Sequence, residues 1–363
     1  MNKEFNIERY LSNGVEKIVK NALKASFSNP RESIFMAKYA HSAKKAIDLR
    51  RSAEENGEHI PPFLIASITS SCNLHCAGCY SRANHACKDS APVDQMTTEE
   101  WDAVFTEAAD MGIGFILLAG GEPFVRKDII EMAAGHPDIL FPIFTNGTMV
   151  TNQYLTLFDK NRNLVPILSI EGSEETTDNR RGKGVYQRLQ DSMRRMKENG
   201  ILFGASVTVT TENMEEVLSD TFINDMYEKG AKAIIYVEFV PVTEEARHLA
   251  PGDEERAYIK KHLQEQREKH DDMVMIAFPG DEKTSGGCLA AGRGFFHINS
   301  HGGAEPCPFS PYSDINVRTA GLRGAMRSAL FQGIQAENLL MEDHAGGCVL
   351  FERREQVEAL MQQ

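Results

Sequence analysis

The chain has 363 residues, 42% hydrophobic and 25% charged, a balance typical of a soluble globular protein. Its formal net charge of −13 argues against a nucleic-acid partner, because a phosphate backbone selects a basic surface. No apolar run approaches the roughly 20 residues of a transmembrane helix, and the first residues lack the apolar centre of a signal peptide. We therefore expect a cytoplasmic protein whose seven cysteines are metal ligands, catalytic thiols or core residues rather than disulfides.

Residues 1–61 form a predicted helical leader. Apolar side chains recur at helical spacing between residues 15 and 23 and again between residues 35 and 47. Pro61 and Pro62 end the leader, because proline stops a helix and biases the preceding residue toward extended geometry.

Six short apolar segments come next, separated by polar segments with helical spacing. A capping-box pattern at residues 97–100 opens the first helix between them. The six predicted strands are Phe63–Thr69, Phe115–Ala119, Ile139–Thr145, Leu164–Ile170, Phe203–Thr210 and Ala233–Val240. Strands that alternate with helices indicate parallel βα units, and six are too few for a closed eight-stranded barrel. The sequence therefore predicts an α/β fold, a partial (β/α)6 TIM-like barrel, over residues 62–279.

Residues 280–363 depart from this alternation. Gly, Pro, Cys and Asn are dense between residues 280 and 316. We expect a separate, loop-rich C-terminal module here.

Three cysteines directly follow the first predicted strand. Cys72, Cys76 and Cys79 lie within eight residues, and three thiolates on one loop can bind three irons of a [4Fe–4S] cluster. The fourth iron is then left for a cofactor or substrate to coordinate. The competing explanations are a zinc site without its fourth ligand and a chance spacing.

This C-x3-C-x2-C pattern resembles that of the radical S-adenosylmethionine superfamily, and the resemblance continues at the ends of the later strands. Its further motifs are Gly120-Gly121-Glu122-Pro123, Thr145-Asn146-Gly147-Thr148, Ser169-Ile170-Glu171-Gly172 with Asp178 and Arg181-Gly182, residues 207–213, and residues 238–242. The family uses the Gly-Gly-Glu-Pro turn to hold the methionine amino group, and a carboxylate can pair with an ammonium.

The resemblance implies a set of cofactor-binding residues. They are Tyr80, Gly120, Gly121, Glu122, Pro123, Asn146, Ser169, Glu171, Arg181, Thr208 and Val240. Two positions depart from the family pattern. Gly78 stands where the family has an aromatic residue near the adenine, so we expect Tyr80 or another side chain to take that place. Glu171 stands where the family has aspartate near the ribose.

The tail carries a second cysteine pattern. Cys288, Gly302 and Cys307 form C-x13-G-x4-C, which resembles the start of the SPASM module, or of its short form, twitch. With Cys348, the resemblance implies three ligands of an auxiliary cluster of the [4Fe–4S] type. Phe351 stands where a fourth cysteine commonly follows. The competing explanation is that these are structural cysteines.

Several residues have more open roles. Cys87 is a candidate catalytic residue as a hydrogen-atom donor, a candidate fourth auxiliary ligand, or an unligated thiol, and Glu238 is a second catalytic candidate. His344 is another candidate fourth ligand, whereas His297 and His301 are taken as solvated or structural. We favour an auxiliary iron that is open or occupied by substrate.

The resemblance implies an oxygen-sensitive radical S-adenosylmethionine enzyme. It would form a 5′-deoxyadenosyl radical and abstract hydrogen from a peptide, in thioether crosslinking, epimerisation or oxidation. The alternative is a dehydrogenase or rearrangement enzyme acting on a small molecule, and the non-enzyme alternative is an iron–sulfur scaffold or partner-binding protein. The expected electron donor is a flavodoxin or ferredoxin.

Overall fold

The computed structural model describes most of the chain. It covers residues 30–90, 94–278, 286–341 and 348–362, together with residues 7, 9, 11–14, 16, 19 and 20.

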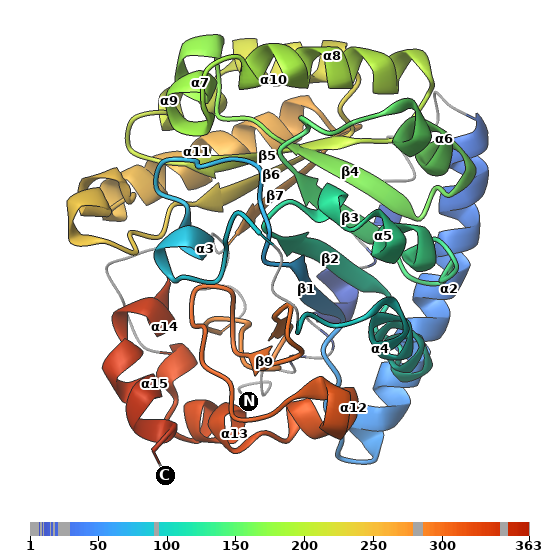
Figure 1. The fold of residues 1–363 in the computed structure, drawn as a ribbon, viewed down its shortest axis with the longest axis vertical. Coiled ribbons are helices and arrows are strands. Elements are labelled where there is room, and N and C mark those ends of the chain that lie inside the picture. The colour runs from blue at the N-terminus through green and yellow to red at the C-terminus, as the bar shows by residue number, and fades with distance from the viewer. Residues whose placement is uncertain are drawn as a thin grey trace.

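One mixed sheet organises the described residues (Figure 1). Its strand order is β7-β6-β5-β4-β3-β2-β1-β8-β9, and β1 to β7 pair in parallel with their sequence neighbours. The seven parallel strands are β1 (Phe63–Thr69), β2 (Phe115–Gly120), β3 (Phe141–Thr145), β4 (Leu164–Ser169), β5 (Gly204–Val209), β6 (Ala233–Glu238) and β7 (Val274–Phe278). The α/β class and all six predicted strands are confirmed. A seventh parallel strand, β7, extends the partial barrel. It was not predicted, because its five residues are too few to show a strand periodicity in the sequence.

Helices cover the outer face of the parallel strands (Figure 1). They are α4 (Thr98–Met111), α5 (Lys127–Ala133), α6 (Asn152–Lys160), α7 (Glu174–Arg181), α8 (Val185–Glu198), α9 (Met214–Val217), α10 (Asp220–Lys229) and α11 (Asp253–Lys269). The predicted capping box is present, since Thr97 accepts from the amide of Glu100 and the carboxylate of Glu100 accepts from the amide of Thr97. Short helices α3 (Tyr80–Ala83), η1 (Pro123–Val125) and η2 (Glu244–Leu249) follow the ends of β1, β2 and β6.

Helix α2 (Pro30–Glu55) confirms a helical N-terminal region. It crosses the amino ends of the strands, where Tyr39 donates to the carbonyl of Gly114 at 2.7 Å. Arg50 donates to the carbonyl of Gly112 at 2.6 Å. These bonds satisfy buried polar groups, so α2 is fixed as the floor of the barrel.

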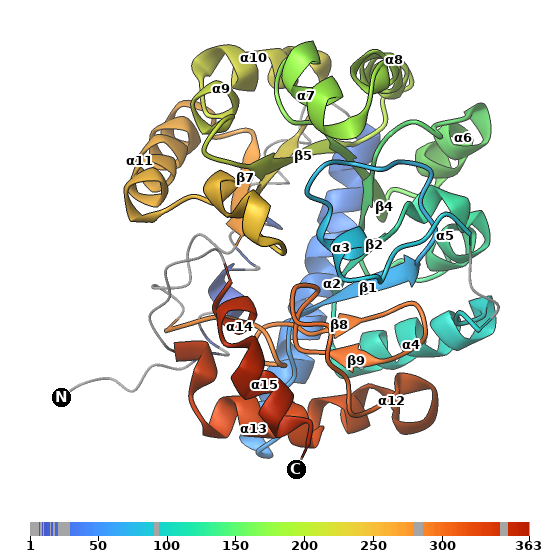
Figure 2. The ribbon, with the colours of Figure 1, turned by 60° about the vertical axis from the view of Figure 1, so that its left-hand side comes forward.

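The tail adds a hairpin to the free edge of β1. Strand β8 (His297–Ile298) pairs in parallel with β1, and β9 (Ala304–Glu305) pairs antiparallel with β8. The helices that follow are α12 (Val317–Met326), α13 (Ala329–Ala336), η4 (Leu339–Met341), α14 (Val349–Glu352) and α15 (Arg354–Leu360). In Figure 2, α12 and α13 lie below the hairpin, and α14 and α15 lie to its left. The expected boundary at residue 280 lies outside the described residues.

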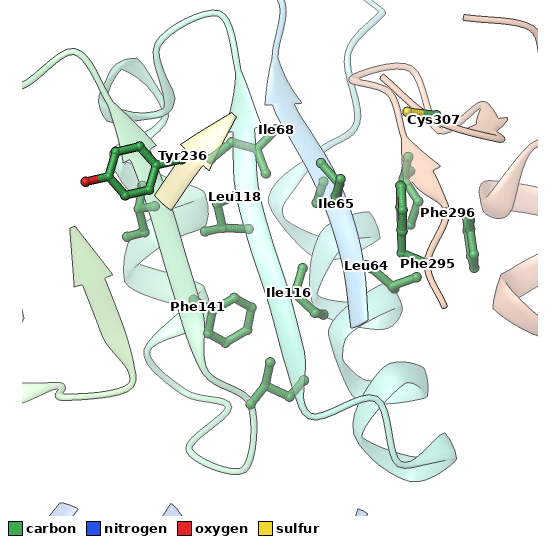
Figure 3. Packing of buried hydrophobic residues seen from close by; sticks show 14 of the residues in the cluster. Leu64, Ile65, Ile68, Ile116, Leu118, Phe141, Tyr236, Phe295, Phe296 and Cys307 are labelled. Carbon is green, nitrogen blue, oxygen red and sulfur yellow. The ribbon is translucent and has the colours of Figure 1, made fainter. Parts of the chain in front are cut away.

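A single hydrophobic core runs from the barrel into the tail. Leu64, Ile116 and Phe141 are buried between the strands and their helices (Figure 3). Phe295 and Phe296 continue this core beside β1. Continuous burial makes the tail hairpin part of the same packed unit as β1, which fixes Cys307 relative to the barrel.

Candidate active site

The carboxyl ends of the strands surround a cavity of about 410 Å³. Thirteen residues expected from the sequence line it: Cys72, Cys76, Cys79, Tyr80, Gly120, Gly121, Glu122, Asn146, Ser169, Arg181, Thr208, Glu238 and Val240. Its deeper part is lined by apolar side chains of the strands and of α2, among them Phe115, Leu117 and Met36. Pro123 begins η1 behind this lining. The cavity thus has a polar mouth and an apolar floor.

Residues 70–79, here the cysteine loop, lead from β1 to α3. The amide of Cys72 donates to the carbonyl of Lys88 at 3.0 Å, and the amide of Ala77 donates to the carbonyl of Arg180 at 2.8 Å. Cys76 interacts electrostatically with both other thiols and with two arginines, so the three sulfurs lie together in a cationic environment. This donor set fits an anionic, thiolate-bound iron–sulfur cluster.

Cys87 lies beside the cysteine loop. It is buried, and its thiol hydrogen bonds with Cys72. This bond, supported by the guanidinium of Arg82, lowers the pKa of Cys72 to about 6, while burial acts in the opposite direction. A thiolate is the form that binds iron. The ionisable neighbours of Cys87 include Cys72 and Cys79, which favours a role at the first cluster over one in the tail.

Gly120 and Gly121 allow β2 to approach the cysteine loop. A Cβ atom on Gly120 would lie 2.2 Å from the carbonyl oxygen of Thr69, and one on Gly121 would lie 2.1 Å from that of Ser71. Gly120 also has a φ of +126°. Any larger residue would push the loop away from the strand, so these glycines set the position of the cysteines.

The buried carboxylate of Glu122 accepts three hydrogen bonds from within the protein. Its carboxylate accepts from the hydroxyl of Thr145 at 2.7 Å, from the amide of Asn146 at 2.7 Å and from the amide of Phe124 at 3.0 Å. Burial raises the pKa of Glu122 to about 7, although these hydrogen bonds act in the opposite direction. Glu122 therefore shapes the turns after β2 and β3, and a bound ammonium would add a charge partner to a desolvated group.

We expect Glu122 to make the cluster-free protein less stable as the pH rises from about 4.5 to about 7. Over this range the folded state keeps a proton that the unfolded state has already released, so stability falls with pH. A pKa raised from 4.5 to about 7 corresponds to roughly 3 kcal/mol above pH 7. Urea unfolding at about pH 5 and about pH 8 should show a smaller pH effect in Glu122→Gln than in the wild type. Equal effects would contradict this.

Glu171 lies behind the cavity wall and joins two arginines. It is fully buried, and its Oε1 atom accepts from Arg180 and, at 2.8 Å, from the Nε of Arg181. Its Oε2 atom accepts from the amide of Thr208 at 3.0 Å, and Arg180 also donates to the hydroxyl of Thr208. Both arginines line the cavity. The sequence motif identified Arg181. Arg180 also belongs to the site, because it is the neighbour of Arg181 at the end of α7.

The remaining expected residues form smaller pairs. The hydroxyls of Ser169 and Ser206 lie 3.0 Å apart. Asn146 donates to the side chain of Asn73 at 2.8 Å, which links the third turn to the cysteine loop. Glu238 is paired with Arg256 at 3.1 Å. Ser206 lines the cavity but stands out in no sequence motif.

Two aromatic rings border the cysteine loop. A Cβ atom on Gly78 would lie 2.7 Å from Cε2 of Phe239, so the ring of Phe239 occupies the space beside this glycine. The ring of Tyr80 instead packs against Phe309 of the tail, with centroids 4.8 Å apart. Phe239, which follows β6, lies within the motif at residues 238–242 but was not singled out there as a cofactor-binding residue, because only the curved sheet brings it to Gly78.

The three tail cysteines come together from separate segments. Cys288, Cys307 and Cys348 are all buried. Burial and the neighbouring thiol of Cys348 raise the pKa of Cys307, and Cys288 also acts on it. Among the described residues, no three His, Cys, Asp or Glu side chains converge on the position of a single metal ion. An iron–sulfur cluster is different, because each of its irons takes its own thiolate, and the three tail cysteines fit that requirement. His344 lies outside the described residues.

Comparisons with known proteins agree with this site. The model of the Radical SAM superfamily matches residues 66–220. The AdoMet-dependent heme synthase of Methanosarcina barkeri is 29% identical over 296 residues, 74% of this chain and 83% of that protein. The PqqA peptide cyclase of Rhizobium meliloti is 29% identical over 261 residues, 68% of each chain. The crystal structure of Streptococcus suis SuiB superposes with a TM-score of 0.66 at 16% identity, covering 83% of this chain and 73% of that one.

A partial parallel barrel with three cysteines after β1 and a Gly-Gly-Glu-Pro turn after β2 defines a radical S-adenosylmethionine enzyme. The family match assigns residues 66–220 of this chain to the Radical SAM superfamily. Its similar proteins include enzymes of the SPASM type. Within the described part of the chain, no helix is both long and apolar enough to cross a membrane.

Proposed function

We propose that the protein is a peptide-modifying radical enzyme with two iron–sulfur clusters. The observation that carries this proposal is that the segment directly after the tail cysteine Cys307 borders the same cavity as the cysteine loop. The Tyr80–Phe309 contact joins the two regions, and Pro308 and Phe309 line the same cavity. A substrate in this cavity would contact both. A relative of comparable length, the PqqA peptide cyclase, is named for a peptide.

The residues of the cavity have distinct proposed roles. Cys72, Cys76 and Cys79 would hold a [4Fe–4S] cluster, and Cys288, Cys307 and Cys348 an auxiliary one. S-adenosylmethionine supplies a 5′-deoxyadenosyl radical when bound and reduced. Arg180 and Arg181, beside Glu171, would face the carboxylate of S-adenosylmethionine. The packed walls of the cavity would keep water away from the radical. Cys87 and Glu238 remain candidates for a group that acts on the substrate.

We further propose that one auxiliary iron has no protein ligand. Phe351 lies on α14 and packs partly buried against the core, so it cannot supply a ligand. Cys87 is turned toward Cys72. A Mössbauer spectrum showing four protein-ligated irons in this cluster would contradict the proposal. We expect a flavodoxin or ferredoxin to reduce the enzyme in the cytoplasm.

A small-molecule substrate is the second candidate. The heme synthase relative covers more of this chain than the peptide cyclase does, and the apolar floor of the cavity would suit a flat or aliphatic molecule. Assays with iron coproporphyrin and with short peptides encoded beside the gene distinguish the two. Product from the first alone would overturn the peptide proposal.

The proposed cluster content gives a direct measurement. After anaerobic reconstitution we expect about eight irons per chain, four for each cluster. With dithionite and S-adenosylmethionine, the protein should release 5′-deoxyadenosine slowly even without substrate. Iron analysis and chromatography test both statements. A preparation that binds zinc, or that never exceeds about four irons, would refute the two-cluster proposal.

We also expect Phe239 to provide an aromatic contact for the cofactor. Stacking of a base on an aromatic ring is worth about 1–3 kcal/mol, so Phe239→Ala should weaken S-adenosylmethionine binding about tenfold. Tyr80→Ala is the matched variant, since that ring packs against Phe309 instead. Equilibrium dialysis with the reconstituted protein measures both. A larger loss in Tyr80→Ala would assign the adenine contact to Tyr80.

A further inference from the structure

The cysteine loop separates the cavity from the solvent. Alternate residues of the loop line the cavity, namely Cys72, Leu74, Cys76 and Gly78. The residues between them are exposed and are not part of the cavity lining, namely Asn73, His75 and Ala77. The loop therefore has an inner face toward the cavity and an outer face toward the solvent. None of the roles proposed above uses the outer face.

The segment after α3 forms one flank of this outer face. The amide of Cys72 donates to the carbonyl of Lys88 at 3.0 Å, so this segment is fixed to the loop. Lys88 is exposed, and in the described part of the chain it forms no ion pair. The neighbouring carboxylate, Asp89, is instead paired with Arg82 at 2.9 Å and with His75 at 3.0 Å. The flank therefore presents the charge of Lys88 to the solvent.

The end of α7 forms the other flank. The amide of Ala77 donates to the carbonyl of Arg180 at 2.8 Å, which holds this end of the helix against the loop. Helix α7 carries its acidic residues in the first turn and its basic residues in the last, so its basic end is the one that meets the loop. Lys183 follows and is exposed, and among the described residues it too forms no ion pair. The carboxylate of Asp178 is held instead by two backbone amides, at 2.6 and 2.8 Å.

The two flanks are basic in a protein that is acidic as a whole. Residues 70–89 and 178–183 hold five Lys and Arg against two Asp and Glu, whereas the whole chain has a net charge of −13. Arg180 and Arg181 are paired with the buried Glu171, so they are already partly neutralised. Lys88 and Lys183 are then the positive charges that a partner on the outer face would meet, and exposed charges act over about 8–10 Å at moderate salt.

We propose that the outer face of the cysteine loop, between Lys88 and Lys183, is the docking surface for the electron donor, a small acidic electron-carrier protein. The proposal rests on the proposed function, in which the cluster of the cysteine loop receives an electron from outside. The lysines would attract the acidic surface of the donor and orient it. Ala77 and Gly78, both exposed, have the smallest side chains of the loop, so the redox group of the donor could approach the backbone closely there.

Docking on the outer face separates electron delivery from the chemistry in the cavity. In each docking event one electron passes from the reduced donor to the cluster. The donor is oxidised by one electron, the cluster is reduced by one, and no bond forms or breaks. Because the donor stays on the solvent side of the loop, the cavity with its cofactor and substrate would stay closed to water meanwhile.

Reduction of the anaerobically reconstituted protein by a reduced, acidic flavodoxin tests the surface, and stopped-flow absorption follows the bleaching of the cluster. The wild-type second-order rate constant should fall steeply as the ionic strength rises, because salt screens the attraction. Lys88→Glu combined with Lys183→Glu should lower the rate constant about tenfold or more at low salt, since two attractive charges become repulsive. These side-chain exchanges keep the backbone bonds that hold the loop. Calorimetry with oxidised flavodoxin gives a readout without electron transfer, and the affinity should fall in the same variant.

Lys44→Glu combined with Lys45→Glu is the matched control. Both lysines are exposed on α2, which crosses the opposite ends of the strands, and the change in net charge is the same. This control should keep the wild-type rate constant within about twofold, because the exchanged charges lie beyond the screening length from the loop. With dithionite, which needs no docking, all three proteins should reach the same extent of reduction.

The outcomes separate the docking surface from the proposed function. Should the loop variant fail to fold, Lys88→Gln combined with Lys183→Gln replaces it and should show a smaller loss in the same direction. A wild-type rate constant that does not depend on salt, or an equal loss in the α2 variant, overturns the docking surface and leaves the proposed function intact. A wild-type protein that dithionite cannot reduce refutes the first cluster, and the docking surface with it.

Discussion

Replacing Cys72, Cys76 and Cys79 together by alanine should lower the iron content from about eight to about four per chain and abolish release of 5′-deoxyadenosine. These thiols share one loop, which is held by the backbone bonds of Cys72 and Ala77 and by the close approach of Gly121. No other described cysteine is placed to replace all three. Iron analysis, the EPR spectrum of the reduced protein and chromatography of the nucleoside products measure the effect.

The tail triple variant is the matched control for this experiment. With Cys288, Cys307 and Cys348 replaced, the cysteine loop and its arginines are unchanged. This variant should also lose about half of the iron, but it should keep slow cleavage of S-adenosylmethionine without substrate. If the tail variant were as inactive as the loop variant, the assignment of separate roles to the two groups would be wrong.

Glu171→Ala should destabilise the protein by about 3 kcal/mol or more. Removing one partner of a buried ion pair costs roughly 3–5 kcal/mol, because the remaining charge stays desolvated. Here two guanidinium groups would lose their shared carboxylate, while the side chains of Arg180 and Arg181 are only 18% and 11% exposed. Urea unfolding of the cluster-free protein measures the change in the free energy of unfolding.

A surface pair provides the comparison for Glu171. Glu198 and Arg194 form a similar contact on the exposed face of α8, with both side chains 57% exposed. Glu198→Ala should leave the unfolding midpoint unchanged, since exposed ion pairs add little to stability. If Glu171→Ala had as small an effect as Glu198→Ala, water would have to reach the two arginines, and the dry cavity wall would be refuted.

The sequence by itself determined the class of this protein. Cys72, Cys76 and Cys79 are close together because they are close in the chain, so their spacing predicted a shared cluster without knowledge of the fold. The apolar strand segments repeat along the chain as the strands of βα units do. Each motif, such as the turn at Gly120–Pro123, directly follows one of these strands. Parallel pairing then brings these strand ends to one edge, which is why 13 predicted residues line one cavity.

The tertiary structure alone decided which distant residues meet. Phe239 contacts Gly78, Cys87 contacts Cys72, and His297 joins Ser67. Such contacts depend on how separate strands and loops pack, and neither composition nor periodicity encodes which side chains then fall within hydrogen-bonding distance. His297 shows this most clearly, because a lone histidine in a loop-rich tail resembles a solvated residue until β8 pairs with β1 and buries it against Ser67 and Glu305.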